Sequence, residues 1–197
     1  MICVDSKNQI YVCDIGLTSS QCDLIVNVSE FCSSGAYSSY TYAKHTIGCH
    51  EHDAMAVVCE WPVKRACTSI KELLKLLELR SNNDDGVNNE DFPRDLVLEE
   101  QEPHVVKYDI SRGEHQKLDM HTDKSEWTFL IALSEGDGCD YEGGGTYFES
   151  INATVHLQKG HALFFPGRLR HRSQKNIAGT SFLLVGFLVK NSFRMFE

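Results

Sequence analysis

The feature that most constrains the fold is a succession of short apolar segments between residues 104 and 190, separated by glycine or polar residues. Segments of this kind are typical of strands, and no helical pattern lies between them, which argues against parallel βαβ units. The sequence therefore favours a sandwich or barrel, and eight such strands suit a double-sheet jelly roll. The predicted strands are His104–Ile110, Lys117–Asp123, Thr128–Ser134, Gly144–Glu149, Thr154–Gln158, His161–Phe165, His171–Asn176 and Phe182–Val189.

The first 80 residues have a mixed α/β pattern. A short strand is predicted at Ile10–Ile15. Hydroxyl side chains that can cap a helix precede apolar residues at helical spacing, which predicts a helix over about Ser19–Phe31. The segment Ala54–Trp61 is apolar with β-branched members and predicts a strand that Pro62 ends. An apolar stripe along Thr68–Leu79 predicts a second helix.

An acidic, polar stretch from Ser81 to Pro103 separates the two halves. Its composition predicts a long mobile loop that proteases cut first. The loop is not expected to be a domain boundary, because the preceding helix has an apolar face that must be covered and a sheet follows. We therefore expect one domain over residues 1–197, mainly β with some α: a support at 1–80 whose helices pack on one sheet, the loop at 81–103 and the jelly-roll core at 104–190.

Charge and composition narrow the classes of partner. The chain has 19 Lys and Arg against 28 Asp and Glu, a net charge of −9, which works against general binding to nucleic acid or anionic membranes. No apolar run reaches the ~18 residues of a membrane span, and no signal peptide is visible. We expect a cytoplasmic or nuclear protein from the chain as it stands, or a secretory one if a signal was removed. The eight cysteines form no C-x-x-C pair, so zinc-ribbon and thioredoxin-type sites are disfavoured and the redox compartment stays open.

Three residues of the β region are candidate metal ligands. His121 and Asp123 are two apart, so on a strand they share a face, and His171 lies on another predicted strand. Two histidines and one carboxylate form the facial triad of non-haem Fe(II) oxygenases, which leaves three octahedral positions open. An H-x-D triplet is by itself a weak signal, and His171 could instead be a surface histidine among neighbouring arginines.

The region from Tyr108 to Val189 resembles the catalytic core of 2-oxoglutarate/Fe(II)-dependent dioxygenases, and most of all their prolyl and lysyl hydroxylase branch. The matching segments agree in order and spacing, and two of them are especially similar to procollagen lysyl hydroxylases. A weaker resemblance extends to the first helix. The matching segments are His121–Asp123, Thr128–Ser134, Tyr141–Phe148, Gly160–Arg168, His171 and Gly179–Val185.

The resemblance implies a cofactor set and a role for some residues. It implies Fe(II) on His121, Asp123 and His171, with 2-oxoglutarate as cosubstrate and ascorbate as a supporting reductant. It also implies that Tyr108 hydrogen-bonds the cosubstrate, although a core tyrosine at this position would give the same pattern.

Ser181 departs from the family. There the family has a lysine or arginine that holds the far carboxylate of 2-oxoglutarate, and a buried carboxylate without such a partner is costly. Lys175, which shares strand parity with His171, could replace that residue, as could one of the arginines Arg168, Arg170 and Arg172. Otherwise the cosubstrate is not 2-oxoglutarate, or the protein is catalytically weak.

These features predict an oxygenase that hydroxylates a C–H bond of a prolyl or lysyl side chain or a related substrate, borne by a protein, a peptide or a small molecule. The alternative is a jelly-roll metal-binding module that is non-catalytic or uses a different cosubstrate, which the serine at 181 favours. A nucleic-acid demethylase is disfavoured by the net charge, although four basic residues lie between Arg168 and Lys175. His50 and His52 form a weaker candidate metal cluster outside the β region. The sequence does not indicate an oligomeric state.

Overall fold

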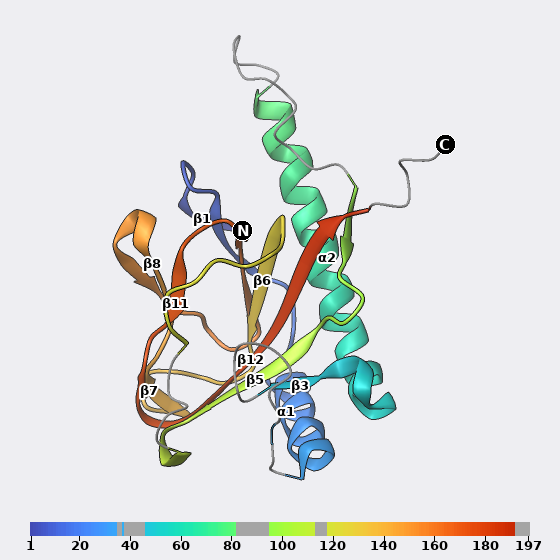
Figure 1. Ribbon diagram of the computed structural model, residues 1–197, viewed down its shortest axis with the longest axis vertical. Helices are drawn as coiled ribbons and strands as arrows, with labels where there is room; N and C mark the ends of the chain where they lie inside the picture. Colours follow the sequence, from blue (N-terminus) through green and yellow to red (C-terminus); the bar gives the residue numbers. More distant parts are fainter. Residues whose placement is uncertain (35–36, 38–45, 82–94, 113–117, 192–197) are drawn as a thin grey trace.

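The computed structural model describes residues 1–34, 37, 46–81, 95–112 and 118–191 (Figure 1). The helices are α1 (Ser19–Ser33) and α2 (Asp53–Ser81), with 3-10 turns η1 (Cys49–Glu51), η3 (Ile110–Arg112) and η4 (Glu149–Ile151). The strands are β1 (Ile2–Asp5), β2 (Ile10–Asp14), β3 (Thr46–Gly48), β4 (Leu96–Leu98), β5 (His104–Asp109), β6 (Trp127–Ala132), β7 (Tyr141–Gly143), β8 (Thr146–Phe148), β9 (Ala153–Val155), β10 (His161–Pro166), β11 (His171–Ser173) and β12 (Asn176–Lys190).

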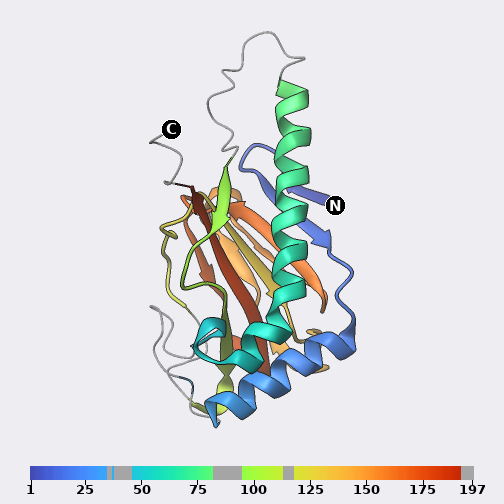
Figure 2. The same cartoon turned by 90° about the vertical axis from the view of Figure 1, so that its right-hand side faces the viewer.

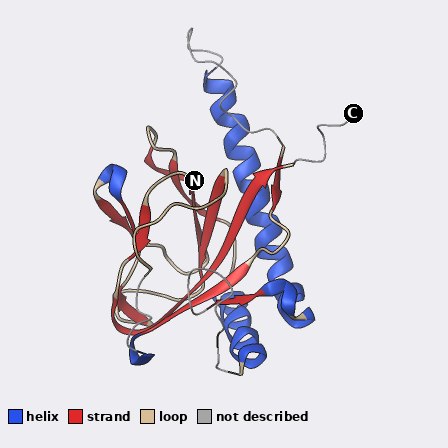
Figure 3. Ribbon diagram, in the orientation of Figure 1, coloured by secondary structure: helices blue, strands red, loops and turns tan. Residues whose placement is uncertain are grey.

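The strands form two antiparallel sheets. The larger has the order β1-β2-β10-β6-β12-β5-β3, with β4 and β7 also paired to β12, and the smaller has the order β11-β8-β9. Strand β12 is 15 residues long and pairs with four neighbours, so it runs through the centre of the large sheet. Figure 3 shows the predominance of strands over helices. The expected mainly-β fold with two sheets is confirmed.

Both helices pack on one face of the large sheet, as expected (Figure 2). Between helices and sheet lies a core to which Ile25 of α1, Ile70 of α2, and Phe129 and Leu184 of the sheet contribute. Helix α1 begins with a capping box, in which the Thr18 side chain accepts a hydrogen bond from the backbone N–H of Gln21. The predicted helix over Ser19–Phe31 is thus confirmed. Neither helix within the described residues is both long and apolar enough to cross a membrane.

The opposite face of the large sheet packs against the small sheet. This second core includes Val106, Leu130 and Phe165 from the large sheet and Phe148 from β8. Because side chains alternate along a strand, β5 turns Val106 and Tyr108 towards the small sheet, while Val105 faces the helices. The space between the two sheets is therefore lined by every second residue of the central strands.

The strand predicted at Ala54–Trp61 is wrong, because this segment begins α2, and Pro62 lies inside that helix. The buried hydrophobic side chains of α2 recur every three or four residues, with both Leu73 and Leu74 in the last turn of this face, which is the spacing of a helix packed on a sheet: Met55, Cys59, Val63, Ala66, Ile70, Leu73 and Leu74. The two adjacent β-branched valines favour a strand in the sequence, but Val57 is 72% exposed and lies outside the packed face of the helix. The helix predicted at Thr68–Leu79 is therefore the second half of α2.

Two strand predictions need correction in the β region. Of the strand predicted at Lys117–Asp123, the described residues from 118 onward contribute only an isolated bridge at His121. The segment predicted as His171–Asn176 is divided between β11 and β12, because Asn176 already pairs with β7. Residues 82–94 of the predicted acidic loop lie outside the described residues, whereas Leu96–Leu98 of that loop form β4.

The packing of α2 can be tested with two substitutions on the same helix. Ile70 is fully buried and Leu76 is 58% exposed. We expect Ile70→Ala to lower the free energy of unfolding by about 2–5 kcal/mol, because it removes a packed side chain and leaves a cavity. Leu76→Ala should change it by no more than about 0.5 kcal/mol. Urea denaturation followed by circular dichroism measures both, and equal losses would contradict the packing of α2 described above.

Candidate metal centre

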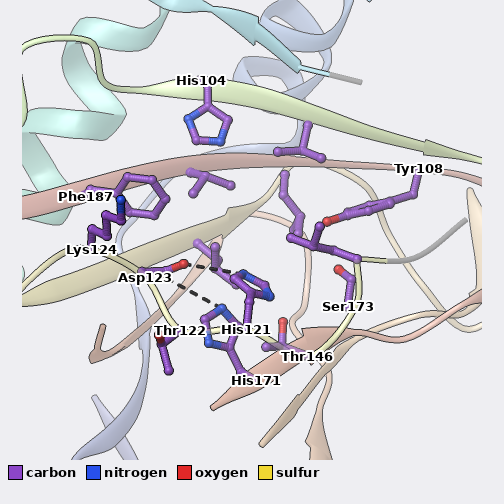
Figure 4. A pocket seen from close by; sticks show the side chains of 15 residues that line it. His104, Tyr108, His121, Thr122, Asp123, Lys124, Thr146, His171, Ser173 and Phe187 are labelled. Carbon is purple, nitrogen blue, oxygen red and sulfur yellow. Dashed lines mark ion pairs between the residues drawn. The ribbon is translucent and has the colours of Figure 1, made fainter. Parts of the chain in front are cut away.

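The structure brings the three predicted ligands together from segments far apart in the chain. The His121 N–H donates to the carbonyl oxygen of His171 at 2.9 Å, and the His171 N–H donates to that of His121 at 3.0 Å. The Asp123 N–H donates to the carbonyl oxygen of Gly167 at 2.9 Å. These backbone bonds place one nitrogen of each histidine and one oxygen of Asp123 within 4.8 Å of one another (Figure 4). Within the described residues this is the one group of three or more such side chains, so His50 and His52 are not part of another.

The orientation of both imidazoles suits a metal ligand. Nδ1 of His121 lies 2.7 Å from the carbonyl oxygen of Asp119, and Nδ1 of His171 lies 2.9 Å from that of Leu169. A carbonyl oxygen only accepts, so each Nδ1 carries a proton, and in the neutral imidazole each Nε2 has a free lone pair. These Nε2 atoms lie 3.4 Å and 3.6 Å from the carboxylate oxygens of Asp123. Adjacent ligands on one cation, with bonds of ~2.1 Å, would be separated by about 3 Å.

The side chain of Asp123 is 6% exposed and is held by its surroundings. Thr128 Oγ1 donates a hydrogen bond of 2.6 Å to Asp123 Oδ2. Burial by itself acts to raise the pKa of Asp123, but the hydrogen bond with His121, the nearby His171 imidazole and the Thr128 hydroxyl lower it below its usual value. The carboxylate is therefore ionised at neutral pH, which is the state that binds a cation.

The two histidines differ in their electrostatic environment. Burial lowers the pKa of His171, which keeps its imidazole neutral and able to bind a metal. Burial also acts to lower the pKa of His121, but the hydrogen bonds with Asp123 and the Asp119 carbonyl outweigh it, so this pKa is raised. The ring of His171 is further held edge-on against Phe165, with 4.7 Å between ring centroids.

The triad opens into a cavity of about 390 Å³ between the two sheets. One wall is apolar and is formed by Val106, Leu183 and Val185 of β5 and β12. His104 lies at the end of the cavity opposite the triad (Figure 4). Its Nδ1 is 2.7 Å from a carboxylate oxygen of the buried Glu102. A cation at the triad would therefore face a confined, mostly apolar space in which a small molecule or a side chain fits.

Tyr108 and Ser181, the two predicted cosubstrate residues, are neighbours on paired strands. Tyr108 lines the metal cavity, and burial raises its pKa to about 12, so its phenol is neutral. Ser181 instead lines a smaller cavity of about 30 Å³, which adjoins the first because Tyr108, Thr146 and Ser173 line both. The structure thus places Tyr108 at the metal cavity and Ser181 in the smaller cavity that adjoins it.

Asn176 is a residue of this site that the sequence reasoning missed. It is 1% exposed, and its Nδ2 donates to the Tyr108 carbonyl oxygen at 3.1 Å and to Ser181 Oγ at 3.0 Å. Gly144, with a φ of +65°, allows this arrangement, because a Cβ there would lie 2.6 Å from Asn176 Oδ1. No motif marks this asparagine, and it meets Ser181 of the same strand because β12 has a register shift between Asn176 and Ala178 and a left-handed residue at Gly179.

The basic residues considered as substitutes for the missing cation lie elsewhere. Lys175 is exposed, Arg170 forms an ion pair of 3.0 Å with Glu149, and the guanidinium of Arg172 lies over the ring of Tyr147. Arg168 lines a surface pocket that shares Asp123 and Lys124 with the metal cavity, but it does not line the cavity at Ser181. Among the described residues that line the two adjoining cavities, Lys124 is the one lysine or arginine, and it lines the larger cavity only.

Sequence comparison finds relatives for part of the chain. No family model matches. The chain is 38% identical over 87 residues to a multifunctional procollagen lysine hydroxylase and glycosyltransferase of Caenorhabditis elegans, and 40% identical over 87 residues to procollagen-lysine,2-oxoglutarate 5-dioxygenase 1 of Rattus norvegicus. Each match covers 43% of this chain and 12% of the relative. The resemblance to lysyl hydroxylases stated from the sequence is confirmed over this part, and the chain spans only a small fraction of the relatives' length.

Comparison with solved structures extends over nearly the whole chain. A viral collagen prolyl hydroxylase of Paramecium Bursaria Chlorella virus-1, solved with 2-oxoglutarate, has a TM-score of 0.61 at 15% identity and covers 97% of this chain and 100% of its own. A prolyl hydroxylase of Trichoplax adhaerens, in complex with a hypoxia inducible factor peptide, has a TM-score of 0.61 at 14% identity. The match covers 93% of this chain and 84% of that one. At this identity the likeness is one of fold, and it confirms the jelly roll expected from the strands.

Loss of one ligand should remove metal binding. We expect His121→Ala and Asp123→Ala to abolish the binding of Mn(II) or Fe(II), because two remaining ligands cannot hold the ion against water. Calorimetry with Mn(II) under reducing conditions measures this. His50→Ala, which removes an exposed imidazole outside the site, is the matched control and should bind as the unchanged protein does. Full Mn(II) occupancy in either ligand variant would mean that the triad is misassigned.

The hydroxyl of Thr128 should contribute to metal affinity without touching the ion. Thr128→Val keeps the shape of this buried side chain but removes the hydrogen bond to Asp123, so we expect Mn(II) affinity to fall by about 10–100-fold. Thr128→Ser keeps the hydroxyl and should retain most of the affinity. If valine and serine have the same effect, the hydrogen bond does not position the carboxylate.

Proposed function

We propose that this chain is an Fe(II)- and 2-oxoglutarate-dependent dioxygenase that hydroxylates a C–H bond of a prolyl or lysyl side chain, or of a related substrate. The observation that carries the proposal is the geometry of His121, Asp123 and His171, with two Nε2 atoms and an ionised carboxylate converging beside an apolar cavity. A triad on one side of the ion leaves the opposite positions to a chelating cosubstrate and dioxygen.

The protein residues have separate tasks in this reaction. Bound iron with a chelating 2-oxo acid would supply the oxidising chemistry, and ascorbate would keep the iron reduced. The carbonyl groups of Asp119 and Leu169 keep both Nδ1 atoms protonated and so aim both Nε2 atoms at the ion. The neutral phenol of Tyr108 can donate a hydrogen bond to the cosubstrate. The apolar wall of the cavity keeps water from the reacting centre.

The names of the relatives support the substrate class. The matched proteins include procollagen lysine hydroxylases and a viral collagen prolyl hydroxylase, and one structural neighbour holds a hypoxia inducible factor peptide. All of these names point to prolyl or lysyl side chains within peptides. A single side chain entering the cavity of about 390 Å³ is compatible with this, and we propose a protein or peptide as the substrate in preference to a free small molecule.

The alternative function is a metal-binding module that does not use 2-oxoglutarate. One observation favours it: Ser181 stands where the resemblance to the dioxygenases implies a basic residue, and the candidate cations Lys175, Arg170 and Arg172 point elsewhere. In that case the triad would still bind a divalent ion, but 2-oxoglutarate would not be consumed.

Turnover distinguishes the two functions. Incubation with Fe(II), ascorbate, dioxygen and 2-oxoglutarate should yield succinate, and prolyl- or lysyl-containing peptides should gain one oxygen atom by mass spectrometry. Asp123→Ala should abolish both products, whereas His50→Ala should leave them unchanged. A chain that binds Mn(II) through the triad yet forms no succinate with any peptide would favour the binding module.

A further inference from the structure

The inner end of the metal cavity differs in charge from the rest of the site. The small cavity beside Tyr108 is lined by Ser181 and Asn176 of β12, together with hydroxyl, amide and apolar side chains. Within the described part of the chain, no charged residue lines it. The larger cavity, by contrast, holds Asp123, the histidines and Lys124. Among the described residues, the part of a chelated molecule that extends away from the metal towards Ser181 therefore meets only neutral groups.

The nearest cations are turned away from this space or occupied. Lys107 precedes Tyr108 on β5 and so points to the opposite face, where its Nζ lies 2.9 Å from a Glu30 carboxylate oxygen of α1. Lys175 precedes Asn176 but is exposed. A carboxylate buried at this inner end would have no charged partner among the described residues, and burying an unpaired charge is far more costly than burying a neutral polar group.

The hydrogen bonds at this end also suit a neutral ligand. Both amide protons of Asn176 are used, one by the Tyr108 carbonyl oxygen and one by Ser181 Oγ. Because Ser181 Oγ already accepts from Asn176, its own proton is left for a weak bond of 3.4 Å back to Asn176 Oδ1 or for a ligand. The pair thus offers one neutral hydroxyl donor, which satisfies an ester, amide or hydroxyl oxygen as well as it satisfies one oxygen of a carboxylate.

We infer that Ser181 and Asn176 form a neutral pocket for the tail of the cosubstrate, so that this chain selects a 2-oxo acid by size and hydrogen bonding and not by the charge of its tail. The inference rests on the proposed function and narrows its cosubstrate. A 2-oxo acid with an uncharged tail should serve this site at least as well as 2-oxoglutarate does. The asparagine and the serine act together, since Asn176 holds the Ser181 hydroxyl in place.

The test compares the binding of three 2-oxo acids to the full chain loaded with Mn(II), measured by calorimetry without dioxygen. The ligands are 2-oxoglutarate, its 5-methyl ester and 2-oxopentanoate, which share the chelating end and differ in the tail. We expect the ester to bind within about threefold of 2-oxoglutarate, or more tightly, because only neutral hydrogen bonds are available. If 2-oxoglutarate binds about tenfold or more tightly than both neutral ligands, the inference is overturned, since such a preference would require a cation at the tail.

Variants at Ser181 provide the matched comparison. Ser181→Arg supplies a guanidinium, so it should shift the preference towards 2-oxoglutarate over the ester by about tenfold or more. Ser181→Ala removes the hydroxyl and should weaken the ester relative to 2-oxopentanoate. A variant is taken as folded if its Mn(II) affinity and its circular dichroism match those of the unchanged protein. If neither variant folds, the three ligands measured on the unchanged protein still decide the question. If none of the three ligands binds the Mn(II)-loaded protein, the proposed function fails and this inference with it, whereas a preference for 2-oxoglutarate overturns the inference alone.

Discussion

Two backbone hydrogen bonds between His121 and His171 hold the site together. They join a segment that otherwise forms no strand in the described residues to the first residue of β11, and they bring both imidazoles to the same point between the sheets. The side chains then need little further support. Two carbonyl groups set the imidazole protons, and Thr128 holds the carboxylate. If that bridge opened, the triad would be lost even though every ligand were still present.

The alternation of β5 divides the molecule into a supporting side and a reactive side. Lys107 faces the helices and pairs with Glu30 of α1, while the next residue, Tyr108, faces the metal cavity. The helices therefore stabilise the sheet from behind without entering the site. This division explains why Lys107 of β5 contributes no charge to the cavity: it is next to Tyr108 in sequence, but its side chain lies on the other side of the sheet.

Much of the β region could be predicted from the sequence, because it depends on local patterns, and the triad could be predicted from its residue types and the family resemblance although its members come from distant segments. His121 and Asp123 are two residues apart, and the central strands, such as β6 and β10, are continuous apolar runs between polar breaks. The first half of α2 could not be predicted in this way, because valines and a proline imitate the end of a strand, and only packing against the sheet selects a helix. Asn176 could not be found either, since its contact with Ser181, five residues further along the same strand, depends on the register shift between Asn176 and Ala178 and on the left-handed Gly179, which bring the two side chains within 3.0 Å.

The length of β12 limits how this protein can change in evolution. The part of β12 from Thr180 onward pairs with β5 and β6 without a register shift, and it carries Ser181 at the smaller cavity and Phe187 at the larger one. Because side chains alternate, the insertion or deletion of a single residue within β12 would turn every residue beyond that point to the opposite face of the sheet. The cavity wall would then meet the helices and the core residues would line the cavity. Natural variation in the size of the pocket should therefore come from substitutions along β12, while changes in length should be found at its ends.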